Sequence, residues 1–451
     1  MPENETRPVE LLVRWLERWR HAIGWVALIG LTVLALDRRC HAFFVNPDLR
    51  AEDGKSVIAF FYSHWEVQRL WRVKAGYVPF MPNVLGYTAV RLPPPIAPYF
   101  MTLVPVIFTV AAFCILKATA FRRHVASDRL RTVCCFAVAL APIGSFFLVC
   151  HTDYSIWNLF ILLLWLVILP LPERKWRAAL VCVLMAILIW SHPLSIAALP
   201  PTLYWLWADK RRFQRGLCAL VVAIQALHVI YGTHAETTAL AHGHESLFQR
   251  GLSALQLCGN VYLDTVSGSV FPYLQAISPL LGRVCAGALL LALTAAAVFP
   301  RRLRVSRGLL LWVLYCIAVP HLMVALTRAS GLWSSRYVYL MRMFALIGFC
   351  ILLWEGLTAL VAKLQRFPRL RMLSWLPEVL VIGFCLSLNR PGSNALYEQQ
   401  TPENGQVIRA CFAELGRLQH ERGSRCNLVV PCRKRGGDWA FTLDSRRTCT
   451  D

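Results

Sequence analysis

The sequence predicts an all-α polytopic membrane protein of about eleven transmembrane helices, with a small α+β domain at its C-terminal end. Two observations favour this class. Hydrophobic residues make up 57% of the 451 residues and charged residues only 16%, against about 25% charged residues in ordinary soluble domains. The apolar residues also gather in stretches suited to crossing a bilayer. This composition excludes a soluble cytosolic enzyme, a disordered regulator and a fibrous protein.

Eleven apolar stretches are the candidate transmembrane helices. They lie at 21–36, 96–116, 132–150, 154–170, 178–190, 194–208, 216–232, 281–299, 308–327, 338–354 and 373–389. Several are shorter than the roughly 20 residues that a perpendicular crossing prefers. The fifth and sixth stretches meet at Ser191-His192-Pro193, where the proline marks either a turn between two helices or a kink in one.

Positive charge predicts the orientation of these helices. The net charge of +22 is explained by basic cytoplasmic loops, and because no nucleic-acid-binding motif is present, no nucleic-acid partner is expected. With the N-terminus inside, the inner segments hold 24 Lys and Arg in 63 residues, and the outer segments hold 21 in 185. The inner segments are 1–20, 117–131, 173–177, 209–215, 301–307 and 363–371. The outer segments are 37–95, 151–153, 191–193, 233–280, 328–337 and 390–451. The N-terminus is therefore expected in the cytoplasm and the C-terminus outside it.

These spans divide the chain into two expected domains. Residues 1–389 form a transmembrane domain with long external loops at 37–95 and 233–280, and residues 390–451 form an extracytoplasmic domain. The first span is expected to stay in the protein, because no signal-peptidase-like site precedes the charged residues that follow it. The second loop has helix-spaced apolar residues near 246–255, which predict a short helix lying on the membrane.

The C-terminal segment has its own pattern. It predicts a helix at about 404–421 and two short strands, at Leu428-Val429-Val430 and Trp439-Ala440-Phe441-Thr442-Leu443. It also holds four cysteines, which in a small domain on an oxidising side predict two disulfides with three alternative pairings. A zinc site is the less favoured alternative, because no C-x-x-C pair is present. The four are Cys411, Cys426, Cys432 and Cys449.

The other cysteines are of two kinds. Cys40 and Cys258 are external and have no assigned partner. Ten more lie in or near the apolar stretches and are interpreted as small apolar residues. They are Cys114, Cys134, Cys135, Cys150, Cys182, Cys218, Cys285, Cys316, Cys350 and Cys385.

The chain lacks the common motifs of soluble enzymes, such as the P-loop, the dinucleotide-binding glycines, G-x-S-x-G and H-E-x-x-H. Its most informative polar feature is Glu52-Asp53-Gly54 in the first external loop. An aromatic-rich stretch at 60–65 and Lys74-Ala75-Gly76-Tyr77 follow in the same loop. Arg336-Tyr337 opens a late helix, and Gly436-Gly437-Asp438-Trp439 lies near the end.

This ordered set resembles a group of bacterial multi-pass membrane proteins with an E-D-G first external loop and, more broadly, the GT-C class of membrane glycosyltransferases. The chain departs from the group at two positions. It has Lys74 where the group more often has an aromatic residue, and Asn83 where the group often has arginine. The resemblance implies a GT-C-like fold in the bacterial inner (plasma) membrane. It also implies transfer of a sugar from a polyprenyl-phosphate donor to a cell-envelope glycan or lipid acceptor at the outer face, among membrane lipids.

The resemblance also implies roles for individual residues. Asp53 is the expected general base, since a carboxylate can take the proton of an acceptor hydroxyl. Glu52 either supports Asp53 or binds a divalent metal. Arg336, with Tyr337 beside it, is expected to bind the donor phosphate, because the guanidinium fork matches phosphate geometry. Arg328 lies in the same short loop and is expected at headgroup level.

Four further residues are candidates for substrate binding, and each has a structural alternative. Tyr77 and His64 either line a sugar site or pack at the membrane interface. Asp153 either binds sugar or caps the fourth helix. His192 either binds substrate or is a satisfied loop histidine, which is the favoured interpretation.

Two other function classes stay open. One is a transporter or flippase of lipid-linked glycans, and the other is a non-catalytic envelope assembly protein. A transporter is expected to show internal repeats and interrupted helices at the membrane midplane. The sequence has no convincing repeat, whereas its candidate polar groups gather on the predicted outer side.

Overall fold

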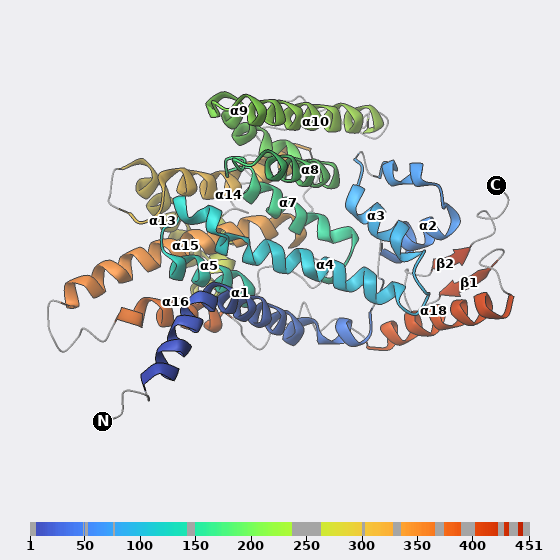
Figure 1. Ribbon diagram of the computed structural model, residues 1–451, viewed down its shortest axis with the longest axis horizontal. Coiled ribbons are helices and arrows are strands. Elements are labelled where there is room, and N and C mark those ends of the chain that lie inside the picture. The colour runs from blue at the N-terminus through green and yellow to red at the C-terminus, as the bar shows by residue number, and fades with distance from the viewer. Residues whose placement is uncertain are drawn as a thin grey trace.

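The computed structural model describes most of the chain. The described residues are 6–47, 49, 53–74, 77–141, 149–236, 263–299, 303–327, 335–365, 374–388, 402–422, 428–432 and 441–444. They form a helical bundle with a small cap at one end (Figure 1). The predicted second-loop helix near 246–255 lies outside these residues.

Each of the eleven predicted apolar stretches contains a helix. These are α1 (Thr6–Val45), α4 (Ala97–Cys114), α5 (Asp128–Leu140), α7 (Ile156–Leu166), α8 (Lys175–Ser191), α9 (Leu199–Ala208), α10 (Arg212–Glu236), α13 (Pro279–Val298), α14 (Arg307–Thr327), α15 (Ser335–Leu364) and α16 (Leu376–Ser387). The 3-10 helix η6 (Pro193–Ala198) separates α8 from α9, so the Ser191-His192-Pro193 segment is a break between two helices.

Some of these helices have the length and hydropathy expected of a membrane-spanning helix. Within the described residues, four helical segments are long and apolar enough to cross a membrane. They are Ala97–Arg123, Arg212–Tyr231, Pro279–Val298 and Val338–Leu364. Shorter apolar helices lie at Asp153–Leu166, Arg307–Pro320 and Leu376–Ser387. The all-α membrane class is therefore supported, while the number of eleven crossings stays a prediction.

Local sequence explains several helix starts. The Ser127 hydroxyl accepts the backbone N–H of Leu130 at 3.2 Å, and Asp128 lies in the first turn of α5. Both features stabilise a helix N-terminus. Ser278 caps α13 in the same way, with proline at the first helical position.

The first external loop is folded into short elements. They are the π-helix η1 (Asp53–Ile58), the helix α2 (Ala59–Ser63), the 3-10 helix η2 (Val67–Trp71) and the helix α3 (Phe80–Ala89). Other short helical segments are η3 (Ile115–Lys117), η4 (Thr119–Arg123), η5 (Asp153–Ser155) and α12 (Pro272–Ile277).

The predicted C-terminal elements are also present. The helix expected at about 404–421 is α18 (Pro402–Arg422), and the two strands are β1 (Val429–Cys432) and β2 (Phe441–Asp444). The strands pair antiparallel, with Val430 opposite Leu443. A disulfide joins Cys411 of α18 to Cys432 of β1, which is one of the alternative pairings. Cys426 and Cys449 lie outside the described residues.

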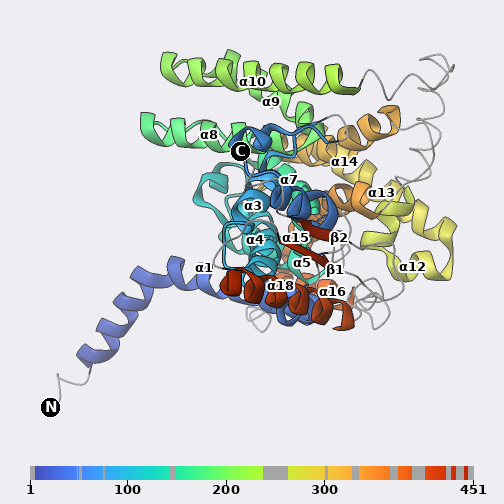
Figure 2. The ribbon, with the colours of Figure 1, turned by 90° about the vertical axis from the view of Figure 1, so that its right-hand side faces the viewer.

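The C-terminal unit and the first loop share one hydrophobic core. Ile408, Phe412 and Leu443 pack in the same buried cluster as Phe61 and Met101. The Ser63 hydroxyl also donates to the carbonyl of Asp444 at 2.9 Å. Figure 2 shows α18, β1 and β2 together at the end of the molecule that carries α3. The C-terminal unit is too small to bury much apolar surface by itself. The core that it shares with the first loop supplies additional buried apolar surface.

Loops assigned to the same side of the membrane contact one another. Among the inner loops, Val125 pairs with Val305 in a β-bridge, and Arg211 donates to the carbonyl of Leu171 at 2.9 Å. Among the outer segments, the backbone N–H of Met81 donates to Ser191 at 3.3 Å. These contacts join the basic loops to one another and the first external loop to Ser191.

Candidate functional site

The candidate site forms where the first external loop meets the turn between α5 and α7. Asp53 begins η1, and residues 151–155 begin the helical segment that continues into α7. The Oδ2 atom of Asp53 accepts the backbone N–H of Thr152 at 2.9 Å, and Oδ1 accepts that of Asp153 at 2.7 Å. The structure therefore brings together two predicted site residues, Asp53 and Asp153, from distant parts of the chain.

The Asp53 carboxylate caps a helix that belongs to another segment. Its residue is only 2% exposed, and its two oxygens receive N–H groups that a helix N-terminus leaves without internal partners. A negative charge at this position is also favoured by the helix dipole. In this arrangement Asp53 positions the Thr152–Asp153 turn, and its role as a base stays a prediction.

Two neighbouring groups fix the same turn. The Thr152 hydroxyl donates to the carbonyl of Met101 on α4 at 2.7 Å. The Nδ1 atom of His151 lies 3.3 Å from Oδ2 of Asp53, and both residues are almost completely buried. The turn is therefore held by α4 on one side and by the first loop on the other.

Asp153 presents its side chain to a different partner. Its carboxylate forms an ion pair with Lys74, with Nζ 2.9 Å from Oδ1, and its side chain is 10% exposed. Neither η5 nor α7 is capped by a side chain of its own segment. The expected alternative role of Asp153, capping the fourth helix, is thus filled by Asp53.

Lys74 also connects Tyr77 to this site. The two residues form a β-bridge in which each backbone N–H donates to the other carbonyl, at 2.8 and 3.3 Å. Lys74 is one of the positions where the chain departs from the group that it resembles. Here that departure supplies the cation that neutralises Asp153.

A second cation lies close to Asp153. Arg72 donates to the carbonyl of Ser56 at 2.9 Å, and its guanidinium carbon lies 3.7 Å from the centroid of the Phe60 ring. Partial burial lowers the pKa of the Arg72 guanidinium, and the charge of Asp153 opposes that shift. Loop and turn therefore meet in a site that combines two carboxylates with lysine and arginine.

His64 and His192 have local partners. The Nδ1 atom of His64 lies 3.0 Å from the carbonyl oxygen of Phe60, and its ring stacks on the Phe60 ring. His192 is fully buried, accepts the backbone N–H of Leu194 through Nδ1 at 3.1 Å, and stacks on Phe160. These contacts agree with the structural alternative for each residue, and substrate binding by either stays a prediction.

Several predicted site residues cannot be placed. Glu52 and Arg328 lie outside the described residues. Arg336 and Tyr337 belong to the first turn of α15, where only the helical backbone is described. Within the described part of the chain, no group of three or more His, Cys, Asp or Glu side chains is arranged to hold a metal ion. The metal role of Glu52 is therefore not tested.

Sequence reasoning missed the neighbours of Asp53. Thr152, His151 and Arg72 were not candidates, and Lys74 was noted only as part of a motif. The polar run His151-Thr152-Asp153-Tyr154-Ser155 between two apolar stretches was the available signal. Which loop this run contacts depends on the packing of α4 and α7.

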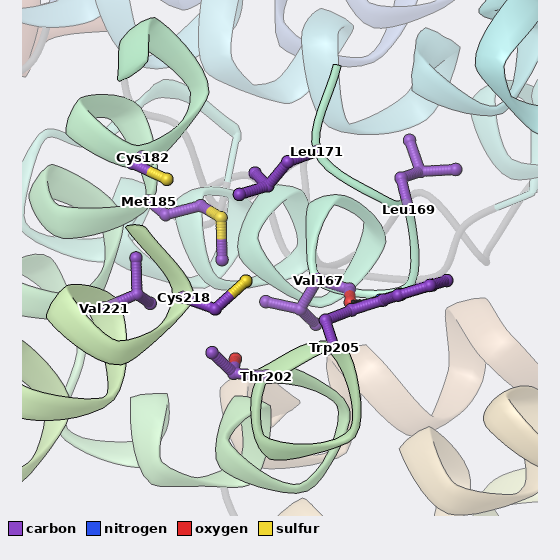
Figure 3. Close-up of a pocket in the computed structure, with 9 residues that line it drawn as sticks. All are labelled: Val167, Leu169, Leu171, Cys182, Met185, Thr202, Trp205, Cys218 and Val221. Carbon is purple, nitrogen blue, oxygen red and sulfur yellow. Dashed lines mark hydrogen bonds between the residues drawn. The ribbon is translucent and has the colours of Figure 1, made fainter. Parts of the chain in front are cut away.

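A separate pocket lies at the other end of α7, among α8, α9 and α10 (Figure 3). Its lining is apolar except for the thiols and one hydroxyl, and it consists of Val167, Leu169, Leu171, Cys182, Met185, Thr202, Trp205, Cys218 and Val221. No charged side chain lines it. This largely apolar pocket is distinct from the Asp53–Asp153 site.

The chain matches no protein-family model, and no curated protein is significantly similar to it.

Proposed function

We propose that this protein is a membrane glycosyltransferase of the bacterial inner membrane. It transfers a sugar from a polyprenyl-phosphate donor to a cell-envelope glycan or lipid at the outer face. The observation that carries the proposal is the contact between Asp53 and the Thr152–Asp153 turn. That contact joins Asp53, the described acidic residue of the first-loop motif, to the turn whose Asp153 pairs with Lys74.

The geometry favours Asp153 as the general base of this reaction. A base must reach the acceptor hydroxyl within hydrogen-bonding distance. Both oxygens of Asp53 are occupied by backbone N–H groups, whereas Asp153 keeps some exposed area beside Lys74. Asp53 then acts as a positioning residue, which fixes the backbone from which Asp153 extends.

Cations near the site suit the leaving group. A polyprenyl phosphate carries negative charge that increases as the glycosidic bond breaks, and lysine and arginine stabilise such charge. Lys74 pairs with Asp153, and the Asp153 charge also acts on the Arg72 guanidinium. We propose that Arg336 and Arg328 also bind the donor phosphate.

The proposal is tested with purified protein in lipid, supplied with polyprenyl-phosphate pentoses and hexoses and an envelope-glycan extract as acceptor. We expect Asp153→Asn to reduce transfer by roughly the 10²–10⁴-fold typical of a lost general base. Glu66→Gln is the matched control, because Glu66 lies in the same loop and forms an ion pair with exposed Arg69. Full activity of both Asp153→Asn and Asp53→Asn would refute the proposal.

The transporter alternative gives a different result in the same set of variants. If Asp153→Asn and Asp53→Asn block movement of a lipid-linked glycan across vesicles and leave every transfer reaction unchanged, the transporter replaces the transferase. If neither transfer nor movement depends on these residues, the non-catalytic assembly protein is the remaining class.

A further inference from the structure

Exposed basic and aromatic side chains gather at the starts of α8 and α10, and the proposed function uses none of them. They come from two segments, residues 173–177 and residues 207–215. Two of the aromatic rings are largely exposed, Trp176 at 62% and Trp207 at 81%. We call this set the basic–aromatic surface. Its members are Arg174, Lys175, Arg177, Lys210, Arg212 and Arg215, with Trp176, Trp207 and Phe213.

Hydrogen bonds hold the two segments together. The buried side chain of Gln214 donates to the carbonyls of Pro172 and Glu173, at 3.3 and 3.1 Å. Across the same junction, the Nζ atom of Lys175 lies 5.7 Å from the centroid of the Phe213 ring. The surface is therefore built by the fold from segments that lie apart in the chain.

The positive charge of this surface is not neutralised by the protein. The two segments hold seven basic residues and two acidic ones, Glu173 and Asp209. Asp209 is buried and pairs with Arg211 at 2.7 Å. Among the residues that the structure describes, no ion pair joins the six basic members of the surface to a carboxylate. An anionic partner is therefore favoured.

Helix stability does not explain these cations. The macrodipole favours acidic side chains in the first turn of a helix and disfavours basic ones. The first turns of α8 and α10 hold no acidic residue, although α8 begins at Lys175 and α10 at Arg212. The basic side chains are thus placed where they cost the helices some stability.

The surface also lies where apolar helices end. One segment that is long and apolar enough to cross a membrane begins at Arg212. α9 ends at Ala208, and α8 and α9 both pack beside α10 (Figure 2). The end of a membrane-spanning helix lies at the level of the lipid head groups, where tryptophan, lysine and arginine are enriched.

We propose that the basic–aromatic surface binds the head groups of anionic phospholipids. Lysine and arginine pair with the lipid phosphates, and the guanidinium fork matches phosphate oxygens. The exposed rings of Trp176 and Trp207 lie between head groups and acyl chains, a position that a free phosphate ion does not offer. A zwitterionic lipid has no net charge and leaves the surface uncompensated. The inference does not depend on the proposed function.

The test is lipid binding by the full-length protein in detergent. The protein is titrated with phosphatidylglycerol or with phosphatidylcholine of the same acyl chains, and bound lipid is counted by native mass spectrometry. We expect preferential binding of phosphatidylglycerol. Combined Lys175→Gln, Arg177→Gln and Arg212→Gln should weaken it about tenfold or more and leave phosphatidylcholine binding unchanged. Trp176→Ala with Trp207→Ala should weaken the binding of both lipids.

The matched control removes three exposed positive charges elsewhere, with Arg69→Gln, Arg409→Gln and Arg417→Gln. It should keep the wild-type preference, and thermal unfolding checks that each variant is folded. Three results overturn the proposal. Wild type binds both lipids equally, the control variant loses as much binding as the test variant, or a millimolar excess of inorganic phosphate displaces the lipid.

Discussion

Asp53 and Asp153 lie one hundred residues apart in the sequence, and the side chain of the first holds the backbone of the second. The Oδ1 atom of Asp53 accepts the Asp153 N–H at 2.7 Å. One carboxylate is thereby fixed as a helix cap, while the other is directed to Lys74. The two aspartates have the same side chain but different surroundings. Asp53 therefore acts as a helix cap, and Asp153 is the partner of Lys74.

Removing the cap should destabilise the protein. In Asp53→Ala, two backbone N–H groups lose their acceptors in a buried place, which costs about 1–3 kcal/mol per unsatisfied group. Asp53→Asn keeps one amide oxygen and should cost less. Thermal unfolding in detergent measures both variants, with Asp37→Asn as the control, since Asp37 lies in a partly exposed i,i+4 pair with His41 on α1. Equal stability of Asp53→Ala and wild type would contradict the capping role.

Replacing Lys74 should lower activity by more than the accompanying loss of stability explains. Its ion pair with Asp153 is largely buried, with 22% and 10% of the two side chains exposed, so losing the cation costs more than the roughly 0–1 kcal/mol typical of a surface pair. Lys74→Met removes the cation that the proposal assigns to the donor phosphate, so the proposed transfer should fall about tenfold or more, while Lys74→Arg keeps most activity. Rates measured alongside unfolding curves separate these effects. A rate loss matched by a loss of folded protein would point to a purely structural role.

Opening the Cys411–Cys432 disulfide should loosen the C-terminal unit from the first loop. For the sequence separation of 21 residues between these cysteines, the chain-entropy model gives a loss of roughly 3 kcal/mol. Cys432→Ser should therefore make α18 susceptible to limited proteolysis, while the helices of the bundle stay intact. Cys285→Ser removes a thiol elsewhere and should leave the digestion pattern unchanged.

A buried hydrogen-bond chain should couple three helices below the site. Tyr339 on α15 donates to Asn158 on α7 at 2.8 Å, and Asn158 donates to Thr109 on α4 at 2.8 Å. Interhelical bonds of this kind contribute about 0.6–2 kcal/mol each in membranes.

A double-mutant cycle with Tyr339→Phe and Asn158→Leu should give a coupling energy of about that size. Tyr315→Phe is the control, because the Tyr315 hydroxyl donates to the carbonyl of Ala197 instead. Strict additivity of the Tyr339 and Asn158 effects would show that the bond contributes nothing.

The orientation of the bundle is also testable. The Lys and Arg asymmetry of the loops predicts an N-terminus and a C-terminus on opposite sides of the membrane. A periplasm-active reporter fused after Asp451 should be active, and a cytoplasm-active reporter at the same position should be inactive. The reverse pattern would mean that the number of crossings is even.

The sequence by itself located the eleven helices that lie in apolar stretches, but not α2, α3 or α12. The stretches 96–116 and 216–232 are α4 and α10 because apolar length is a local property, which needs no knowledge of the fold. The C-terminal helix and strands were found for the same reason. Asp53 could also be singled out, since it is an acidic residue in a loop between apolar stretches.

Only the tertiary structure decided what these residues contact. Three contacts join segments that are separate in the chain. Asp53 accepts the N–H groups of Thr152 and Asp153, and Lys74 pairs with Asp153. In the C-terminal unit, Cys411 is bonded to Cys432. Such contacts arise from the packing of α4, α7 and the shared core of the first loop and α18. A local sequence pattern predicts that a buried carboxylate needs a partner. Which residue is that partner depends on the helix packing, because packing determines which groups lie within hydrogen-bonding distance.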